Sequence, residues 1–393
     1  MMAGKEFPRW FSGPAASRRV AGAVMRHGPV SRAQLAERLG LTAGTVSRAV
    51  GELLADGVIE EDGAEEAGRD WAAPKRGRPQ HDLRIRAASH TFLGANIHDR
   101  SLTVSMVDAA GRPVGDSLTE LLDGMGPGMV SAQIGRMARR VVKDATKDAF
   151  PSPTAIGVSI GGHVRGGRVV TQAPFVRWDE PIDLAGLVEE ATGLPAAVFN
   201  DLDAFLVHEH WFGDAVDTDR FAVLTIGAGI GYALADDGKP VDCADQSYGL
   251  AAHILVDAHG PECSEGHIGC SQCLTEASMA EEYSAILGRD VSFADFTRDL
   301  ENGKPQAARL GERTAFRLRA LVATVANLAM PKLVVVSGES SFIARQSMES
   351  VRKGIDCFRH SQASPVRFTV PPFTWRLWSD AAATHALVRF LGE

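Results

Sequence analysis

The 393 residues predict an α/β protein with a small helical head and a larger body of two strand-rich lobes. Three observations support this prediction. The chain is longer than one hydrophobic core usually serves. The apolar residues of its N-terminal part follow a helical period, whereas from Phe92 onward short β-type runs alternate with helical ones, as in α/β architecture. We expect a head over 1–62, a wing and linker over 63–90, and a body over 91–393.

Composition excludes several classes of protein. An apolar content of 45% with 23% charged residues is ordinary for a soluble globular protein. No apolar run approaches the roughly 20 residues that span a bilayer, and the start of the chain lacks the pattern of a secretory signal. We therefore expect a cytoplasmic protein without a membrane partner. Residues 1–90 carry a net charge of +3 and the remainder −11, so any nucleic-acid contact must use a local basic patch.

Within the head, local signals predict three short helices and a turn into a strand. Gly28-Pro29 ends the first helix, because proline cannot continue a helix. Ser31 is a good N-cap for the second helix, and Gln34 completes a capping box. Gly40 closes that helix, and the third follows directly.

The second and third helices have the spacing of a helix-turn-helix, whose second helix enters the major groove of DNA. Small polar side chains and one arginine are expected on the exposed face of the third helix, and a basic run, KRGR, follows in the linker. The predicted DNA contacts are Ser31, Thr42, Thr45, Ser47, Arg48, Arg76 and Arg78. The alternative is a small helical bundle without a DNA role, with the basic run as a solvated linker.

The body is expected to contain at least seven strands and six helices. The strands are expected at 92–97, 102–108, 155–160, 197–199, 221–226, 231–235 and 333–337. The helices are expected at 129–147, 185–192, 202–212, 279–287, 306–329 and 379–391. One lobe is expected to start near residue 90 and the other near residue 215.

Several motifs in this order resemble the ROK family, which joins repressors and sugar kinases on one fold. They are SRAQLAERLGLTAGTVSRAVGELLADGVIEE, GRP at 77–79, NDLDA at 200–204, IGAGIG at 226–231, GLAAH at 249–253 and CSEGHIGC at 263–270. The resemblance covers nearly the whole chain. It implies a winged helix-turn-helix followed by a two-lobed, actin-like ATPase fold, and a homodimer or homotetramer.

The phosphate loops separate a regulator from a kinase. The first loop of the family usually contains D-x-G-G-T, whereas this chain has Asn96-Ile97-His98-Asp99-Arg100, with neither the carboxylate nor the glycines that hold Mg²⁺ and phosphate. The second loop, Gly227–Gly231, is intact. We therefore expect neither ATP binding nor kinase activity.

The resemblance also implies a sugar pocket that is partly retained. Its expected residues are Asn200, Asp201, Gly162, His253 and Gln272. Two pocket glutamates of the family are absent, because Leu250 and Gln272 stand in their places. A purely structural alternative is that the Asn-Asp pair caps the helix that follows it.

A zinc site is the one cofactor that the resemblance implies. His253, Cys263 and Cys270 match the family's ligands, but the middle cysteine of the motif is Glu265. We expect Cys273 as the fourth ligand, with Glu265 and His267 as alternatives, and a structural role for the metal. The alternative is a metal-free loop with buried, inert cysteines.

These features predict a sugar-responsive transcription regulator. A carbohydrate effector would close the two lobes, and closure would change the spacing of two heads on operator half-sites about 34 Å apart. Two other functions stay open: an active sugar kinase with a DNA-binding head, and a ligand-independent regulator whose pocket serves only for assembly.

Overall fold

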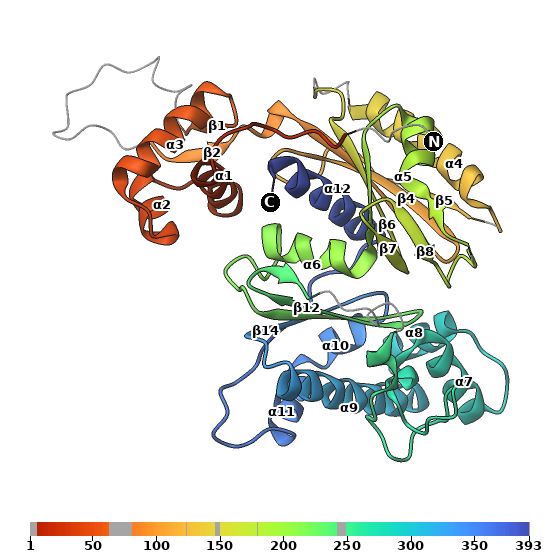
Figure 1. Ribbon diagram of the computed structural model, residues 1–393. Coiled ribbons are helices and arrows are strands. Elements are labelled where there is room, and N and C mark those ends of the chain that lie inside the picture. Colours follow the sequence, from red (N-terminus) through yellow and green to blue (C-terminus); the bar gives the residue numbers. More distant parts are fainter. Residues whose placement is uncertain are drawn as a thin grey trace. The chain divides into compact units, whose positions relative to one another are not determined.

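The structure, a computed structural model, describes residues 6–62, 81–122, 124–145, 150–178, 180–241 and 249–392. Contacts divide the chain into two compact units (Figure 1). The first comprises Met1–Phe212 with Arg376–Glu393, and the second comprises Gly213–Trp375. The head therefore belongs to the same compact unit as the first lobe. The helices within the described ranges are all too short or too polar to cross a membrane.

The head is a winged helix. It contains α1 (Ala15–His27), α2 (Arg32–Leu39), α3 (Ala43–Ala55), and the antiparallel pair β1 (Ile59–Glu61) and β2 (Leu83–Ile85). The predicted helix ends are confirmed, because α1 ends directly before Gly28 and Ser31 forms a capping box with Gln34. Gly40 closes α2 in the left-handed conformation, at φ +62°.

The first lobe is a five-stranded sheet covered by helices on both faces. Its strand order is β10-β6-β3-β4-β5, with antiparallel pairs along β3-β4-β5 and parallel pairs along β3-β6-β10. One face packs on α4 and α5, and the other on α6 and α12 (Figure 1). A small sheet, β7-β8-β9, follows β6. The bounds are η1 Ala87–Ser89, β3 Thr91–His98, β4 Ser101–Asp108, β5 Leu118–Leu121, α4 Pro127–Ala145, β6 Ala155–Ile160, β7 His163–Arg165, β8 Val169–Gln172, β9 Ile182–Asp183, α5 Leu184–Thr192, β10 Ala196–Asn200, α6 Asp201–Phe212 and α12 Trp375–Leu391.

Two glycines let α12 lie directly on this sheet. Gly94 in β3 and Gly157 in β6 are partners in the strand register. A Cβ on Gly94 would lie 1.8 Å from the carbonyl oxygen of Ser379, and one on Gly157 would lie 2.0 Å from that of Ala382. Because both positions lack a side chain, the backbone of α12 approaches the sheet at van der Waals distance.

The second unit repeats this sheet pattern. Its strand order is β13-β12-β11-β14-β15, again with two antiparallel and then two parallel pairs. The long helix α9 and α11 cover the core of this sheet. The bounds are β11 Phe221–Ile226, β12 Ile230–Asp236, β13 Lys239–Pro240, η4 Leu250–His253, η5 Ser271–Leu274, α7 Glu276–Leu287, α8 Phe293–Glu301, α9 Pro305–Leu328, β14 Leu333–Ser337, α10 Phe342–Gln346, α11 Met348–Cys357 and β15 Arg367–Thr369.

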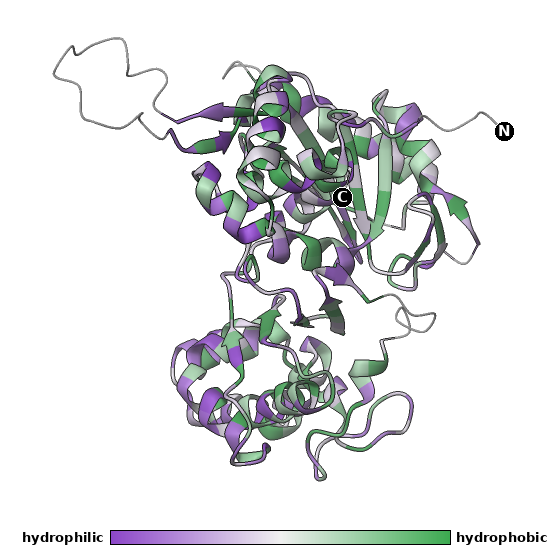
Figure 2. Cartoon of the chain, turned by 60° about the vertical axis from the view of Figure 1, so that its left-hand side comes forward, coloured by the Kyte–Doolittle hydropathy of each residue, from purple (hydrophilic) through white to green (hydrophobic). Residues whose placement is uncertain are grey.

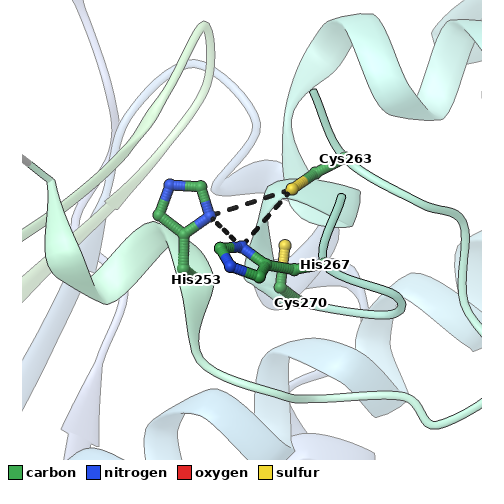
Figure 3. Close-up of side chains that lie close together, drawn as sticks. All are labelled: His253, Cys263, His267 and Cys270. Atoms are coloured by element: carbon green, nitrogen blue, oxygen red, sulfur yellow. Dashed lines mark hydrogen bonds between the residues drawn. The ribbon is translucent and has the colours of Figure 1, made fainter. Parts of the chain in front are cut away.

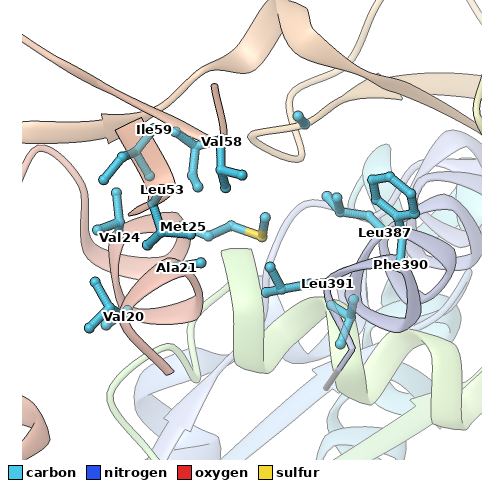
Figure 4. Close-up of a cluster of buried hydrophobic side chains, with 14 of the residues drawn as sticks. Val20, Ala21, Val24, Met25, Leu53, Val58, Ile59, Leu387, Phe390 and Leu391 are labelled. Atoms are coloured by element: carbon cyan, nitrogen blue, oxygen red, sulfur yellow. The ribbon is translucent and has the colours of Figure 1, made fainter. Parts of the chain in front are cut away.

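The hydrophobic core of the head continues into the first lobe. One cluster of buried side chains joins α1, α3 and the wing to the C-terminal half of α12 and to Trp211 of α6 (Figure 4). Leu387, Phe390 and Leu391 are the α12 members of this cluster labelled in the figure. The chain before α1 adds a backbone hydrogen bond of 2.8 Å from Trp10 to Phe390, and their rings stack 5.6 Å apart. Head and first lobe therefore bury a common apolar surface.

All seven predicted body strands and the six predicted helices are present, with some ends shifted. The sequence did not predict the short strands β5, β7–β9, β13 and β15, or the helices α8, α10 and α11. Each of these strands has only two to four residues, too few for a period to stand out. Figure 2 shows the central strands mostly hydrophobic and the outer helices with mixed faces, as expected for sheets covered on both sides.

Candidate functional site

The third helix of the head presents its predicted contact residues on the outside. Thr42, Ser47 and Arg48 are exposed, and Thr45 is half-buried. Thr42 caps α3 by accepting a hydrogen bond from the backbone N–H of Thr45, so its hydroxyl also serves the helix. Among the described residues Arg48 has no ion pair, which leaves its guanidinium available to a ligand.

The other three predicted DNA-contact residues are Ser31, which already has hydrogen-bond partners, and Arg76 and Arg78. The Ser31 hydroxyl donates to the Gln34 side chain at 2.9 Å and accepts from its backbone N–H at 3.3 Å, so it is already used in the capping box. Arg76, Arg78 and the GRP motif lie outside the described residues.

The first lobe places Asn200 and Asp201 at the start of α6. The Asn200 side-chain oxygen accepts hydrogen bonds from the backbone N–H groups of Leu202 and Asp203, at 2.9 and 3.2 Å. Its amide nitrogen donates to the carbonyl of Gly162 at 2.8 Å. Asn200 therefore caps the helix and ties it to the loop after β6. One N–H hydrogen of the Asn200 amide is left to bind a sugar hydroxyl, as the sequence predicted for this residue.

Asp201 keeps one carboxylate oxygen for a ligand. Its Oδ1 accepts from the backbone N–H of Leu202 at 2.8 Å. Its Oδ2 lies 3.3 Å from the position that a Cβ would occupy on Gly161, where there is no side chain. Burial raises the pKa of Asp201 to about 6, and the neighbouring Asp203 adds to this increase. A carboxyl group whose pKa is strongly raised by desolvation is a candidate for a functional role.

The loop between β3 and β4 has no glycine cradle. Asn96 is buried in β3, and its amide donates to the hydroxyl of Ser159 in β6 at 3.0 Å. The chain then turns through the exposed residues Asp99 and Arg100 into β4. The Asn96 side chain thus joins two strands, and bulky residues form the turn where a phosphate cradle would need backbone N–H groups.

The glycine turn between β11 and β12 carries a carboxylate of the chain itself. A Cβ on Gly227 would lie 1.8 Å from Oε2 of Glu339, so this carboxylate is seated directly over the glycine. Glu339 follows β14, and the backbone N–H of Ser340 binds the carbonyl of Ile226 at 3.0 Å. A negative charge at this position opposes a phosphate group.

Four metal-binding side chains come together in the second unit (Figure 3). They are His253, Cys263, His267 and Cys270, and their ligand atoms all lie within 4.8 Å of one another. The Nδ1 atoms of the two histidines are 3.1 Å apart. The sulfur of Cys263 lies 3.8 Å from Nδ1 of His253 and 3.7 Å from Nδ1 of His267. In Figure 3 the other ring nitrogen of His253 points away from the cluster.

The spacing of these donors suits a tetrahedral zinc ion. With ordinary zinc–ligand bonds, two nitrogens on one ion lie about 3.3 Å apart, and a nitrogen and a sulfur about 3.6 Å apart. The observed separations of 3.1, 3.7 and 3.8 Å are close to these values. Two histidines and two cysteines are also a common zinc donor set. The residues present therefore fit the metal.

The predicted fourth ligand, Cys273, lies outside this cluster. Cys273 packs in the hydrophobic core of the second unit, next to β11, β14 and α9. Burial raises the pKa of its thiol to about 12, so it stays protonated. Glu265 is exposed and lies outside the cluster, whereas His267, the other alternative, lies within it.

Tertiary contacts of the segment 254–271 create this geometry. Leu255 pairs with Cys270 in a single antiparallel bridge, which brings Cys270 beside His253. The backbone N–H of Cys263 binds the carbonyl of His267 at 3.0 Å and closes the outer turn. Arg317, a fully buried residue of α9, holds the segment by a 2.9 Å ion pair with Asp257. No local pattern points to Arg317, because its partner Asp257 lies 60 residues away in the chain.

Two further predicted pocket residues, His253 and Gln272, belong to the two 3₁₀ turns of the second unit. Leu250 is exposed at the start of η4, and His253 ends that turn. Gln272 lies half-buried in η5. Gly162 belongs to the first unit, where its carbonyl holds Asn200.

The chain combines a winged helix with two lobes that contain matching five-stranded sheets. This combination defines a class of proteins in which a winged-helix DNA-binding domain is fused to a domain with the sugar-kinase fold. Residues 131–371 match the profile of the ROK family, and residues 14–70 match that of the MarR family. The first match covers more than half of the chain, so this protein belongs to the ROK family.

Individual relatives agree with this assignment. A protein named as a putative xylose repressor from Caldicellulosiruptor is 22% identical over 351 residues, which cover 84% of each chain. The crystal structure of a ROK family transcriptional regulator, a homologue of the Escherichia coli Mlc protein, superposes with a TM-score of 0.73 at 22% identity over 95% of this chain and 96% of its own. A ROK family glucokinase from Streptomyces griseus, in complex with glucose and AMPPNP, has a TM-score of 0.61 at 21% identity and covers 75% of this chain and 98% of its own.

The raised pKa of Asp201 predicts a pH-dependent gain in stability on substitution. The folded state keeps this carboxyl protonated up to about pH 6, whereas the unfolded state ionises it from its ordinary pKa of 3.8. The free energy of unfolding is therefore higher at low pH, and this extra stability is lost as the pH rises through 6. Asp201→Asn should therefore raise the free energy of unfolding at pH 7.5 by up to about 3 kcal/mol and change it little at pH 4. Urea denaturation at both pH values measures the difference. An equal gain at both would contradict the raised pKa.

Proposed function

We propose that this protein is a sugar-responsive transcription regulator that binds operator DNA through its head and senses a carbohydrate in its body without transferring phosphate. The observation that carries the proposal is the continuity of α6: its first residue, Asp201, has a carboxylate oxygen beside Gly161, and Trp211 near its end contacts the head. The similarity to a protein named as a xylose repressor supports the same function.

The DNA-binding part of the proposal rests on α3. Its core side packs against α1, which leaves Ser47 and Arg48 on the outer surface. In a helix-turn-helix this surface meets base edges and phosphates in the major groove. A second head from another copy would contact the neighbouring half-site, so we include a homodimer or homotetramer in the proposal.

The absence of phosphate transfer rests on two loops. Asn96 uses its amide to join strands, and the turn after it lacks glycine. Glu339 places a carboxylate over the other glycine turn. Both features disfavour the triphosphate of ATP, whose charge needs N–H donors and a cation.

The signal from sugar to DNA has a direct structural path in α6. At about 1.5 Å per residue, its 12 residues span about 18 Å. At its far end the indole of Trp211 lies against α1, where a Cβ on Gly22 would be 3.3 Å from the ring, and the guanidinium of Arg26 lies 5.9 Å from the ring centroid. A shift of Asp201 on ligand binding would therefore move a side chain that packs directly on the head.

Zinc is the proposed cofactor, with a structural role. His253, Cys263, His267 and Cys270 would hold it, and it would supply a crosslink between η4 and the turn at 263–267. Since the other ring nitrogen of His253 points away from the cluster, that side chain could bind zinc on one side and an effector on the other.

Arg48→Ala should weaken operator binding by about 1–3 kcal/mol, because it removes an exposed cation of the recognition helix. Fluorescence anisotropy with the duplex upstream of the protein's own gene measures the change. Arg309→Ala, which removes an exposed arginine from α9, is the matched control and should have no effect. Equal affinity of the Arg48 variant and the wild type would remove α3 from its proposed role.

Trp211→Leu should uncouple sugar from DNA. The substitution removes the indole that packs on Gly22 and Arg26 of α1, so operator affinity without sugar should be nearly kept while the effect of sugar on that affinity is lost. The measurement is the operator dissociation constant with and without the sugar that most raises the melting temperature of the wild type. Phe205→Leu changes a buried α6 residue that packs on Trp378 instead, and it should keep the response. A full response in the Trp211 variant would exclude this path.

His267→Ala should abolish stoichiometric zinc binding, whereas Cys273→Ala should retain it, because only the first residue faces the cluster. Mass spectrometry of metal content after dialysis against chelator-free buffer compares the two variants with the wild type. Zinc loss from the Cys273 variant alone, or no zinc in the wild type, would contradict this ligand set.

A further inference from the structure

The metal cluster contains two cysteines that differ in their exposure to solvent. Cys263 is half-buried at the outer turn, whereas Cys270 is buried, with 2% of its surface exposed. Their sulfur atoms lie within 4.8 Å of each other, since all four ligand atoms of the cluster do. Figure 3 shows both sulfur atoms towards the centre of the cluster. One thiol is therefore accessible to a small reagent from solvent, and a shielded thiol lies next to it.

The backbone between these cysteines is a small hairpin. Glu262 and Ile268 pair in an antiparallel bridge, which holds its two arms side by side. The residues of its turn, 264–268, are all exposed. A disulfide needs the sulfur atoms about 2.0 Å apart, so they would have to approach by less than about 3 Å. Because the turn is exposed, a shift of this size at Cys263 disturbs no core packing.

The other cysteines of the described ranges are placed differently. Cys273 packs in the hydrophobic core of the second unit and lies outside the cluster. Cys357 is exposed in α11, where its thiol donates to the carbonyl of Lys353. Within the described part of the chain, a disulfide is therefore expected between Cys263 and Cys270.

A disulfide and a metal ion exclude each other in this cluster. Zinc binds cysteine as the thiolate, and one disulfide would consume both of the cysteines that the cluster offers. The two histidines that remain are only half of the donor set. Oxidation would therefore release the metal, and His253, which ends η4, would no longer be crosslinked to the turn that carries His267.

We propose that Cys263 and Cys270 form a reversible oxidation site for hydroperoxides, which replaces the metal crosslink of the second unit with a disulfide. Cys263 is the residue that reacts with the peroxide, and Cys270 is the one that resolves the product. This thiol chemistry goes beyond the proposed regulator function and does not depend on the metal, whereas the release of zinc rests on the zinc site proposed above.

The reaction has two steps. The Cys263 sulfur attacks one oxygen of the hydroperoxide, the O–O bond breaks, and the other oxygen leaves as an alcohol, or as water when the oxidant is hydrogen peroxide. Cys263 is then a sulfenic acid. The Cys270 sulfur attacks the sulfenic sulfur, the S–O bond breaks, and the hydroxyl leaves with the Cys270 thiol proton as water. In sum, two thiols and one hydroperoxide give one disulfide, one alcohol and one water.

The test treats the zinc-loaded full chain with a small excess of hydrogen peroxide, removes the excess with catalase, and counts thiols in guanidinium chloride. The reduced chain has five cysteines, so the oxidised chain should have three thiols, five minus the two that are joined. Mass spectrometry should find Cys263 linked to Cys270, and a chromogenic chelator should detect the released zinc. Dithiothreitol should restore all five thiols and zinc binding.

Two variants test the assigned roles. In Cys270→Ser, the sulfenic acid of Cys263 should persist and be captured by dimedone, which labels sulfenic acids. In Cys263→Ser, dimedone should not label Cys270, because this thiol is buried. An unfolded chain would expose both cysteines alike, so a difference between the two variants reports the folded protein. Labelling of Cys270 in place of Cys263 would overturn the assignment.

Cys357→Ser is the matched control, because it removes an exposed cysteine from a different helix. On oxidation it should still lose two thiols and its zinc. A wild type that keeps five thiols, or that links Cys270 to Cys273, would overturn the oxidation site. If the disulfide forms in a protein that holds no zinc, the oxidation site stands and the zinc proposal fails. Operator affinity of the untreated protein tests the proposed regulator function separately.

Discussion

The contact on which the rest of this protein depends is the packing of α12 on the first sheet. Gly94 and Gly157 lie side by side in adjacent strands and leave no side chain between the helix backbone and the sheet. The helix is therefore held at a short, well-defined distance. Its far end carries Leu387 and Phe390 into the core of the head, so the position of the head depends on a helix that belongs to the lobe. A winged helix linked only by a flexible tether would have no such dependence.

The start of α6 combines structural and ligand-binding roles in two residues. Asn200 uses its amide oxygen to cap the helix, which frees Asp201 from most of that task. Asp201 then keeps its other carboxylate oxygen close to Gly161, although desolvation raises the pKa of this carboxyl group. Residues that reduce stability in this way are common where a protein binds a ligand, because the ligand replaces the lost solvation.

The metal cluster illustrates how burial and strand pairing choose among similar residues. Cys270 and Cys273 are three positions apart, yet one faces His253 and the other enters the hydrophobic core. The bridge between Leu255 and Cys270 determines which residue faces the cluster. The segment between them is in turn anchored by Arg317, whose buried charge is balanced by Asp257 and Glu282. The ligand set is thus a property of the whole unit.

The sequence by itself determined the helices of the head, the long strands of both sheets and the two-lobed α/β class, because caps, glycine stops and apolar periods act over a few residues. The family also followed from motifs within continuous stretches. Only the tertiary structure decided that His267 takes the place expected for Cys273, that the Asn200 side chain is used within the lobe, that Glu339 covers Gly227, and that the head shares its core with α12. Each of these outcomes depends on residues far apart in the chain competing for burial and hydrogen bonds, and that competition leaves no local pattern to detect.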